Sequence, residues 1–320
     1  MWHQVNTLPA QAVAKAPGKA ILLGEHFVVH GSSALAVALD IGVEARAERS
    51  DSNIISSVRE NNVISAKIED AEGFLAPAAF SLKQFLKDHS LSGVSVKITS
   101  EIPESAGLGS SAASSVSAIS AVSNLFGIKL SKKKLYHYSM LAEQIVHGKP
   151  SGIDAFVSIN GGLVYVRRKT KKVLPCRPFK LLVSYSGIQR NTGQMVSKVA
   201  SFKEREPKSF RNLMRAINAL VPDVIAGLRK GELPILAAAM NFNHEALRIV
   251  GASNEALDRM VRYAREVGFV GAKMTGAGGG GCIIALPKQE DEKEFENFKT
   301  IYPNSFLCNV PAEGVRCWLV

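Results

Sequence analysis

The chain has 320 residues, of which 46% are hydrophobic and 21% charged, and its formal net charge at pH 7 is +11. This composition excludes a wholly disordered chain, a collagen-like repeat and a small disulfide-stapled protein. At roughly 150 residues per domain, the length predicts two domains. The excess of basic residues favours a polyanionic partner: a nucleic acid, an anionic membrane or a phosphorylated small molecule.

The first ten residues, MWHQVNTLPA, do not combine a basic stretch with an apolar run, so no signal peptide is predicted. No apolar segment reaches the roughly 18 residues needed to cross a bilayer. The four cysteines include no pair separated by two residues, the spacing typical of zinc and redox sites. We therefore expect a cytoplasmic protein with reduced thiols and no membrane partner.

The first half of the chain alternates strand patterns with helical patterns. The clearest helix covers 110–126, where apolar side chains recur at spacings of three and four residues and Gly127 follows at the expected end. Strands are predicted at 20–23, 35–39, 41–47 and 93–99, and further helices at 78–89, at about 132–147 and from about 151.

A polar, basic and proline-containing stretch at 167–178 marks the boundary between two predicted domains, 1–176 and 177–320. Because strands and helices alternate irregularly, we expect an α+β fold rather than a doubly wound parallel sheet. The basic runs 129–134 and 167–172 lack interleaved aromatic residues, so we interpret both as solvated faces and expect no nucleic-acid partner. Beyond the boundary, strands are predicted at 180–185, 282–286 and 315–320, and helices at 208–230, 233–248 and 254–267.

A glycine- and serine-rich segment at 103–115 gives the sharpest local signal. Gly107 and Gly109 let the backbone turn tightly and approach a ligand just before the helix at 110–126. The first turn of that helix has unpaired N–H groups and a positive dipole end, which together form an anion site. Ser110 and Ser111 add hydroxyls for phosphate oxygens or Mg²⁺. The Gly-Lys-Ser/Thr ending of a P-loop is absent, and a strand–helix turn with a serine cap is the alternative.

Polar residues also flank the buried strand at 20–23. Lys19 precedes this strand and Gly24-Glu25-His26 follows it, so charged groups lie beside apolar surface. An ordinary strand with a solvated lysine and a turn would explain the same pattern.

A second glycine-rich run, Gly276 to Gly281, precedes the strand at 282–286. Glycines weaken a strand, and a sheet edge tolerates them where a ligand or another backbone must come close. A glycine-rich hairpin is the alternative.

Two carboxylates lie in the segment 143–154. Glu143 is on the polar side of its predicted helix, in line with Ser139 and His147, as a solvated stripe would also be. Ser151 and Asp154 fit a Ser-x-x-Asp capping box, which is a purely structural role. The density of unusual residues in this segment favours a functional role instead.

Four segments in this order together resemble the GHMP small-molecule kinases. The first motif runs from Pro17-Gly18-Lys19 through Gly24-Glu25-His26 to His30-Gly31, the second is Gly107-Leu108-Gly109-Ser110-Ser111-Ala112, and the third runs from Lys273 to Gly281. The block His147-Gly148-Lys149-Pro150-Ser151-Gly152-Ile153-Asp154 is similar to that of the members that phosphorylate mevalonate. Arg190-Asn191-Thr192 resembles the Arg-x-Thr element of the family.

The resemblance implies a two-domain GHMP kinase fold with the active site in the cleft between the domains. The N-terminal domain would be similar to domain 2 of ribosomal protein S5, and the C-terminal domain would be ferredoxin-like. The resemblance also implies ATP as co-substrate, Mg²⁺ as cofactor, mevalonate as phosphate acceptor in isoprenoid biosynthesis, and a homodimer.

By the same resemblance, each motif contributes residues to the site. Asp154 would be the catalytic base, and Lys19 would lie between the substrate hydroxyl and the γ-phosphate. Glu143 and Ser111 would hold Mg²⁺, which prefers a few carboxylate and hydroxyl oxygens together with phosphates. Substrate would contact Glu25, His26 and Thr192, and ATP would contact Pro103, Glu104, Ser105, Ala106, Gly107, Leu108, Gly109, Ser110, Ser111, Ala112, Gly276, Ala277 and Gly278.

Three other functions would share some of these features. A GHMP kinase for another small alcohol would carry the same motifs, although the presence of Asp154 argues against the homoserine type. An S5-like RNA-binding module would explain the charge of +11, but it has no use for Glu143, Asp154 or the glycines at 276–281. A regulator that has lost catalysis predicts the loss of Lys19 or Asp154, and both are present.

Overall fold

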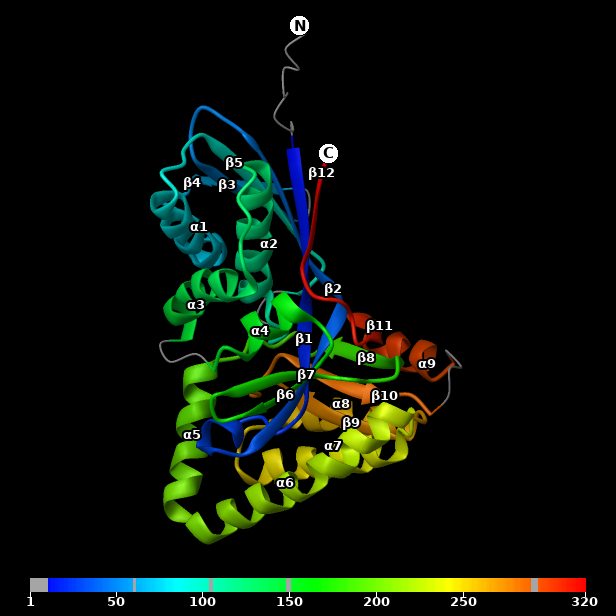
Figure 1. The fold of residues 1–320 in the computed structure, drawn as a ribbon. Coiled ribbons are helices and arrows are strands. Elements are labelled where there is room, and N and C mark those ends of the chain that lie inside the picture. Colours follow the sequence, from blue (N-terminus) through cyan, green and yellow to red (C-terminus); the bar gives the residue numbers. More distant parts are fainter. Residues whose placement is uncertain (1–10, 60–61, 104–105, 148–150, 289–292) are drawn as a thin grey trace, which may run out of the picture.

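The computed structural model describes residues 11–59, 62–103, 106–147, 151–288 and 293–320. This part of the chain forms two sheets flanked by helices (Figure 1). The first sheet has the order β12-β1-β2-β5-β3-β4, with β6 pairing with β2 and β7 with β6, and the second has the order β11-β8-β10-β9. The α+β class predicted from the sequence is confirmed.

The strands of the first sheet are β1 (Gln11–Leu23), β2 (Ser33–Arg49), β3 (Ile54–Arg59), β4 (Asn62–Lys67), β5 (Val94–Ser100), β6 (Leu163–Arg167), β7 (Thr170–Leu174) and β12 (Arg316–Leu319). Those of the second are β8 (Phe179–Tyr185), β9 (Gly271–Thr275), β10 (Cys282–Leu286) and β11 (Ser305–Val310). The helices are α1 (Ala76–Asp88), α2 (Ser110–Leu125), α3 (Lys132–His147), α4 (Ile153–Asn160), α5 (Thr192–Arg205), α6 (Pro207–Lys230), α7 (Pro234–Ile249), α8 (Glu255–Glu266) and α9 (Lys293–Ile301).

β2 is one strand of 17 residues where the sequence predicted two, at 35–39 and 41–47. Gly42 interrupts the apolar pattern without ending the strand. A Cβ on Gly42 would lie 2.3 Å from the carbonyl oxygen of Ala16, so only glycine lets β1 and β2 approach this closely. The result is a long pair of strands whose register shifts between Pro17 and Lys19 and again between Ile21 and Leu23. The pair runs through the middle of the molecule, from the α1–α3 group toward the α5–α8 group (Figure 1).

α2 is buried on every side, although its sequence predicted a single apolar stripe. Its small alanines and serines let it lie against β1 and β2 and beneath α1 and α3. Several serine hydroxyls donate to carbonyls of the preceding turn, as Ser115 does to Ser111 at 3.1 Å and Ser117 to Ser114 at 3.2 Å. These bonds satisfy polar atoms that burial would otherwise leave unpaired.

The second sheet is buried on both faces because its strands alternate between two hydrophobic clusters. Leu181 and Val183 of β8 pack with residues of β1 and β2, whereas Leu182 packs with residues of α7 and α8. The two sheets therefore share one core across their junction. No helix in the described part of the chain is long and apolar enough to cross a membrane.

The chain passes from the first sheet to the second between β7 and β8, where the boundary at 176/177 was predicted. It later returns, since β12 pairs antiparallel with β1 in the first sheet. The division into domains 1–176 and 177–320 stays a prediction, and by its pairing the last strand belongs to the first sheet.

His244 of α7 is buried beside Asp258 of α8. Its Nε2 lies 3.4 Å from Oδ1 of Asp258, and its Nδ1 accepts a hydrogen bond from the N–H of Met274 at 3.4 Å. Burial lowers the pKa of His244 to about 4, and the opposing effect of Asp258 is smaller. His244 is therefore neutral at pH 7, and its contact with Asp258 is not a pair of two charges.

His244 is expected to make the protein acid-sensitive. The unfolded chain binds a proton at this residue below about pH 6.5, whereas the folded chain does so only below about 4. The stability that this difference contributes is complete above pH 6.5 and is lost as the pH falls toward 4, on the order of 3 kcal/mol in total. Melting curves of His244→Gln should therefore depend less on pH between 6.5 and 4.5 than those of the wild type. The exposed His137, changed to Gln, is the control, and equal pH slopes for all three proteins would contradict the expectation.

Candidate functional site

Lys19 of β1 and Asp154 of α4 lie next to each other, beside Gly107 and Gly109 of the second motif. The Lys19 side chain is 3% exposed, and its Nζ lies 3.3 Å from Oδ1 of Asp154. The same Nζ donates a hydrogen bond to the carbonyl of Gly107 at 2.9 Å. A Cβ on Gly109 would lie 3.2 Å from Cγ of Lys19 and 3.6 Å from Oδ2 of Asp154, so the glycine loop closes directly over this pair. The alternative of a solvated lysine is wrong.

The capping box predicted for Ser151 and Asp154 is not formed. α4 begins at Ile153, and its N-cap is Gly152 in the left-handed conformation, with no side-chain cap. Ser151 Oγ accepts a hydrogen bond from the N–H of Ile153 at 3.3 Å, not from that of Asp154. The Asp154 carboxylate, 21% exposed, is thus directed to Lys19.

Glu143 of α3 is buried next to the same pair, so the alternative of a solvated stripe is wrong. Its side chain is 4% exposed, and Oε1 accepts a hydrogen bond from the N–H of Ala155 at 2.8 Å. Burial, followed by repulsion from Asp154, raises the pKa of Glu143 to about 7, and the smaller effects of Ala155 and Lys19 oppose this shift. Two carboxylates close together in a buried place form an environment that a cation would stabilise.

The loop before α2 has the geometry of an anion site. Gly109 is the N-cap of α2 with φ of 80°, a left-handed conformation that favours glycine, and no side chain caps the helix. The Ser110 Oγ is buried and has no hydrogen-bond partner among the described residues. A helix N-terminus with an unpartnered hydroxyl beside it fits a phosphate oxygen or a metal bound to phosphate.

The second glycine run adjoins this loop. A Cβ on Gly276 would lie 3.3 Å from the carbonyl oxygen of Gly107, and one on Gly281 would lie 2.9 Å from that of Ala106. The close approach of another backbone, expected from the glycines, is therefore observed. The ring of His26 donates from Nε2 to the carbonyl of Ala277 at 2.8 Å, which ties the first motif to this run.

Arg190 is a site residue that the sequence reasoning did not include. Its Nη1 would lie 3.0 Å from a Cβ on Gly107 and 3.2 Å from one on Gly276, so the guanidinium sits between the two glycine loops. Burial lowers the pKa of Arg190, and Asp154 opposes this shift. The Arg-x-Thr element in the sequence is the signal that points to this position.

Glu25 lies where no ligand would reach it in this conformation. Its side chain is 0% exposed, it pairs with Lys273, and its Oε2 accepts a hydrogen bond from Nδ2 of Asn243 at 3.0 Å. The expected contact between Glu25 and substrate does not fit this geometry. Thr192 is the first residue of α5, and the structure gives it no contact with Lys19 or Asp154.

Some residues of the predicted site fall outside the described part of the chain: Glu104 and Ser105 of the phosphate loop, and Gly148, Lys149 and Pro150 of the block before α4. Pro103 lies at the near end of the phosphate loop and is half-buried.

The residues at the site fit Mg²⁺ held jointly with phosphate. Within the described ranges, no group of three or more His, Cys, Asp or Glu side chains could hold a metal ion by itself. Glu143, Asp154 and the unpartnered Ser110 hydroxyl supply oxygens of the kind that Mg²⁺ prefers, and Mg²⁺ commonly completes its shell with substrate phosphates and water.

A basic pocket opens beside α4. It has a volume of about 870 Å³ and includes Ser151 and Ile153, the residues that precede Asp154. Its cationic side chains come from the end and turn of β6 and from α5: Arg167, Arg168, Lys169 and Lys203. His30 also lines the pocket, but burial and then Lys203 lower its pKa, and its Nδ1 accepts from Nζ of Lys203 at 3.2 Å. This pocket therefore suits an anionic ligand.

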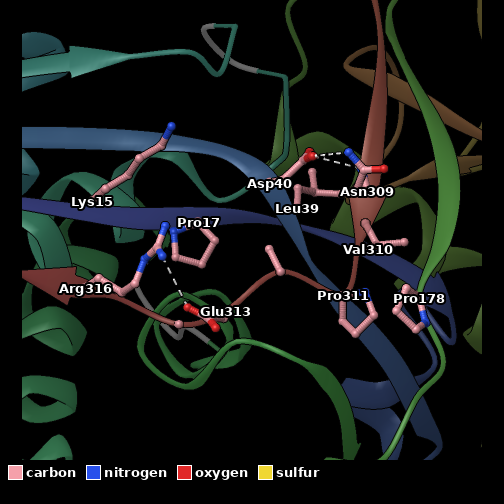
Figure 2. Close-up of a pocket in the computed structure, with 12 residues that line it drawn as sticks. Lys15, Pro17, Leu39, Asp40, Pro178, Asn309, Val310, Pro311, Glu313 and Arg316 are labelled. Carbon is pink, nitrogen blue, oxygen red and sulfur yellow. Dashed lines mark hydrogen bonds and ion pairs between the residues drawn. The ribbon is translucent and has the colours of Figure 1, made fainter.

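Another pocket, of about 350 Å³, lies at the junction of β1, β2 and the segment between β11 and β12 (Figure 2). Three prolines line it, and its charged groups have partners of their own. Asp40 accepts from the side chain of Asn309 at 2.9 Å, and Arg316 pairs with Glu313 at 3.5 Å. Apart from Pro17 it contains no motif residue, so we do not assign it to the reaction.

Comparisons with known proteins identify the family of this chain. The family models for the N-terminal and C-terminal domains of GHMP kinases match residues 76–162 and 224–301. Mevalonate kinase from Pyrococcus abyssi is 34% identical over 97% of this chain and 98% of its own length. Mevalonate kinase from Archaeoglobus fulgidus is 36% identical over 95% of this chain and 99% of its own.

Solved structures show the same relationship. L. major mevalonate kinase in complex with R-mevalonate has a TM-score of 0.82 and 27% identity, covering 93% of this chain and 95% of that one. Lactococcus lactis galactokinase, at 18% identity and a TM-score of 0.76, shares the fold alone. The two-domain GHMP kinase fold is confirmed, and the RNA-binding alternative is set aside. The chain belongs to the GHMP kinase family, within its mevalonate kinase group, and is an ATP-dependent kinase.

Proposed function

We propose that this kinase transfers the γ-phosphoryl group of ATP to the 5-hydroxyl of mevalonate, giving 5-phosphomevalonate and ADP for isoprenoid biosynthesis. The observation that carries the proposal is the contact of the buried Lys19 with the partly exposed Asp154 beneath the glycine loop. The curated relatives named mevalonate kinase, with 34% and 36% identity over nearly the whole chain, support the choice of acceptor.

In this proposal Asp154 is the base. As the O5–Pγ bond forms and the bond from Pγ to the bridging oxygen of ADP breaks, the proton of the 5-hydroxyl passes to the Asp154 carboxylate. Lys19 lies against that carboxylate and offsets charge on the transferring group. Phosphoryl transfer requires mainly such positioning and charge neutralisation.

The nucleotide phosphates would lie against the α2 N-terminus and the adjoining run from Gly276. Arg190 stands between both loops, where a guanidinium can bind phosphate oxygens through two N–H groups. Glu143 and Ser110 or Ser111 would hold Mg²⁺, which when bound neutralises charge on the β- and γ-phosphates.

The basic pocket beside α4 would hold the carboxylate of mevalonate. Its lining includes cationic side chains together with Ser151 and Ile153 of the segment that leads into Asp154. An acceptor bound this way would present its far hydroxyl toward the base. His26 and Thr192 remain proposed contacts of the acceptor, and a cytoplasmic homodimer remains a prediction.

The test is an assay of ADP release over a panel of alcohols, with phosphorus NMR of each product. The panel contains mevalonate, its uncharged lactone, homoserine, galactose and phosphomevalonate. We expect turnover with mevalonate, giving a phosphate monoester at the 5-position, and none with the lactone, which lacks both the carboxylate and the free 5-hydroxyl. Faster turnover of another alcohol would replace the proposed acceptor.

The metal site gives a further expected result. Ser111→Ala should raise the concentration of Mg²⁺ needed for half-maximal rate more than it raises the KM for mevalonate, because a metal oxygen ligand is lost. Ser110→Ala, measured alongside, decides which of the two hydroxyls serves, since only Ser110 Oγ is shown to be buried and unpartnered. If both variants keep the wild-type dependence on Mg²⁺, neither serine belongs to the metal site.

A further inference from the structure

A fully buried ion pair lies where the two sheets meet, and the proposed transfer does not use it. Lys273 of β9 and Glu25, which follows β1, pair with both side chains 0% exposed. Lys273 Nζ also donates to the carbonyls of Ile21, at 3.2 Å, and Met274, at 2.6 Å. Burial lowers the pKa of Lys273, and Glu25 opposes that shift.

The pair is part of a network that joins three segments. Asn243 of α7 donates to Oε2 of Glu25 at 3.0 Å and accepts from the N–H of Gly24 at 3.0 Å. Thr275, two residues beyond Lys273, accepts from the N–H of Ile21 at 2.9 Å. The end of β1 is therefore held to β9 and α7 at several points.

Each segment leads directly to the site. Ile21 lies two residues beyond Lys19 in β1, and Thr275 is followed at once by the glycine run that begins at Gly276. His26, next to Glu25, donates to Ala277 within that run. The network thus connects Lys19 in the first sheet with the Gly276–Gly281 run that extends from the second.

Stability alone is a poor explanation for such a pair. Removing two charges from water costs more than their attraction commonly returns, and hydrophobic replacements of buried pairs are often as stable or more stable. A charged pair with several hydrogen bonds fixes the relative positions of the segments that it joins, because each bond constrains the groups at its two ends. A displacement of about 1 Å at reacting groups can cost a factor of about 100 in rate.

We propose that Glu25 and Lys273 are positioning residues that fix the Gly276–Gly281 loop relative to Lys19 and Asp154. The Glu25 carboxylate then acts through Lys273 and Asn243 instead of touching the acceptor. The inference rests on the proposed function, since it concerns the geometry of that transfer.

The test compares Glu25→Gln, Lys273→Met and the double variant. Each single change leaves one buried charge without its partner, so the melting temperature should fall by on the order of 10 °C. The double variant contains no lone charge and should regain most of that loss. The kcat per folded molecule should nevertheless be about 10- to 100-fold below wild type in all three, with smaller changes in either KM, because the tie between the loop and β1 is absent.

The proposal is decided by whether kcat and the melting temperature change together in the double variant. If kcat returns to the wild-type value in the double variant together with the melting temperature, the pair is merely structural and the proposal is overturned. If the single variants do not fold, the kcat of the double variant still tests the proposal. Asn243→Ala, which keeps both charges, is a second test. We expect a lower kcat for this variant, and an unchanged kcat counts against the network.

Ser305→Ala is the matched control. Ser305 donates to Ser184 at 2.9 Å, buried between β11 and β8 of the second sheet, and neither residue belongs to the site or the network. This variant should lose stability and keep the wild-type kcat. The wild-type assay with mevalonate tests the proposed function separately from these comparisons. If the wild type is inactive on mevalonate but active on another alcohol, the proposed acceptor is wrong. The variants are then compared on that alcohol.

Discussion

Asp154→Asn is expected to lower kcat by about 10²- to 10⁴-fold, the range typical of a lost general base. Asparagine keeps the size of the side chain and an oxygen 3.3 Å from Lys19 Nζ in the wild-type geometry, but it cannot accept the hydroxyl proton. The KM values for mevalonate and MgATP should change little, because the lost interaction belongs to the transition state. Initial rates and binding of ADP by calorimetry measure the two effects separately.

The effect of Asp154→Asn on stability has one expected source. Asp154 does not cap α4, so no helix cap is lost, and any fall in melting temperature must come from the buried Lys19 ammonium that loses its charged partner. Rates are therefore measured per folded molecule, well below the melting temperature. Near-wild-type turnover of folded Asp154→Asn would refute the assignment of the base.

Lys19→Met is expected to have an effect of similar size, with kcat lower by about 10²- to 10³-fold, as for the loss of one preorganised charge at a developing negative charge. Methionine fills most of the volume of the lysine stem, so packing within β1 is retained. The change removes the ammonium that pairs with Asp154, and it leaves the carbonyl of Gly107 without its donor. Initial rates at saturating mevalonate and MgATP measure the loss.

Lys15→Met provides the matched comparison for this prediction. Lys15 lies in the same strand, and its Nζ pairs with Glu101 at 2.8 Å, but the two side chains are 34% and 50% exposed. A partly exposed pair of this kind contributes little to stability. Lys15→Met should therefore retain the wild-type kcat. Equal losses in the two lysine variants would show that charge on β1, rather than the position of Lys19, governs the rate.

The sequence by itself determined the features whose causes are local. A glycine loop running into a helix start predicted the anion site before α2, and the periodic apolar patterns predicted α2, α3, α6, α7 and α8 within two residues of their observed ends. These features can be predicted without the tertiary structure, because helix periodicity and glycine conformations depend on residues within a few positions of one another.

Elements with weak local patterns were missed. β7 consists mainly of exposed polar residues, so it shows no alternation that separates it from the polar stretch at 167–178, and its pairing with β6 is what makes it a strand. The strand at 315–320 was predicted, but its place in the first sheet beside β1 was not. A strand pattern states which residues can pair and not which partner they choose.

The same distinction between local sequence and tertiary packing applies to the site. The sequence identified Lys19, Glu143 and Asp154 as residues of the right chemical type, while burial and contact between them were decided by the packing of β1, α3 and α4. The position of Arg190 between the glycine loops, and the pairing of Glu25 with Lys273, came only from the tertiary structure. These contacts join positions far apart along the chain, and a buried charge finds its partner through three-dimensional proximity, which no short sequence window contains.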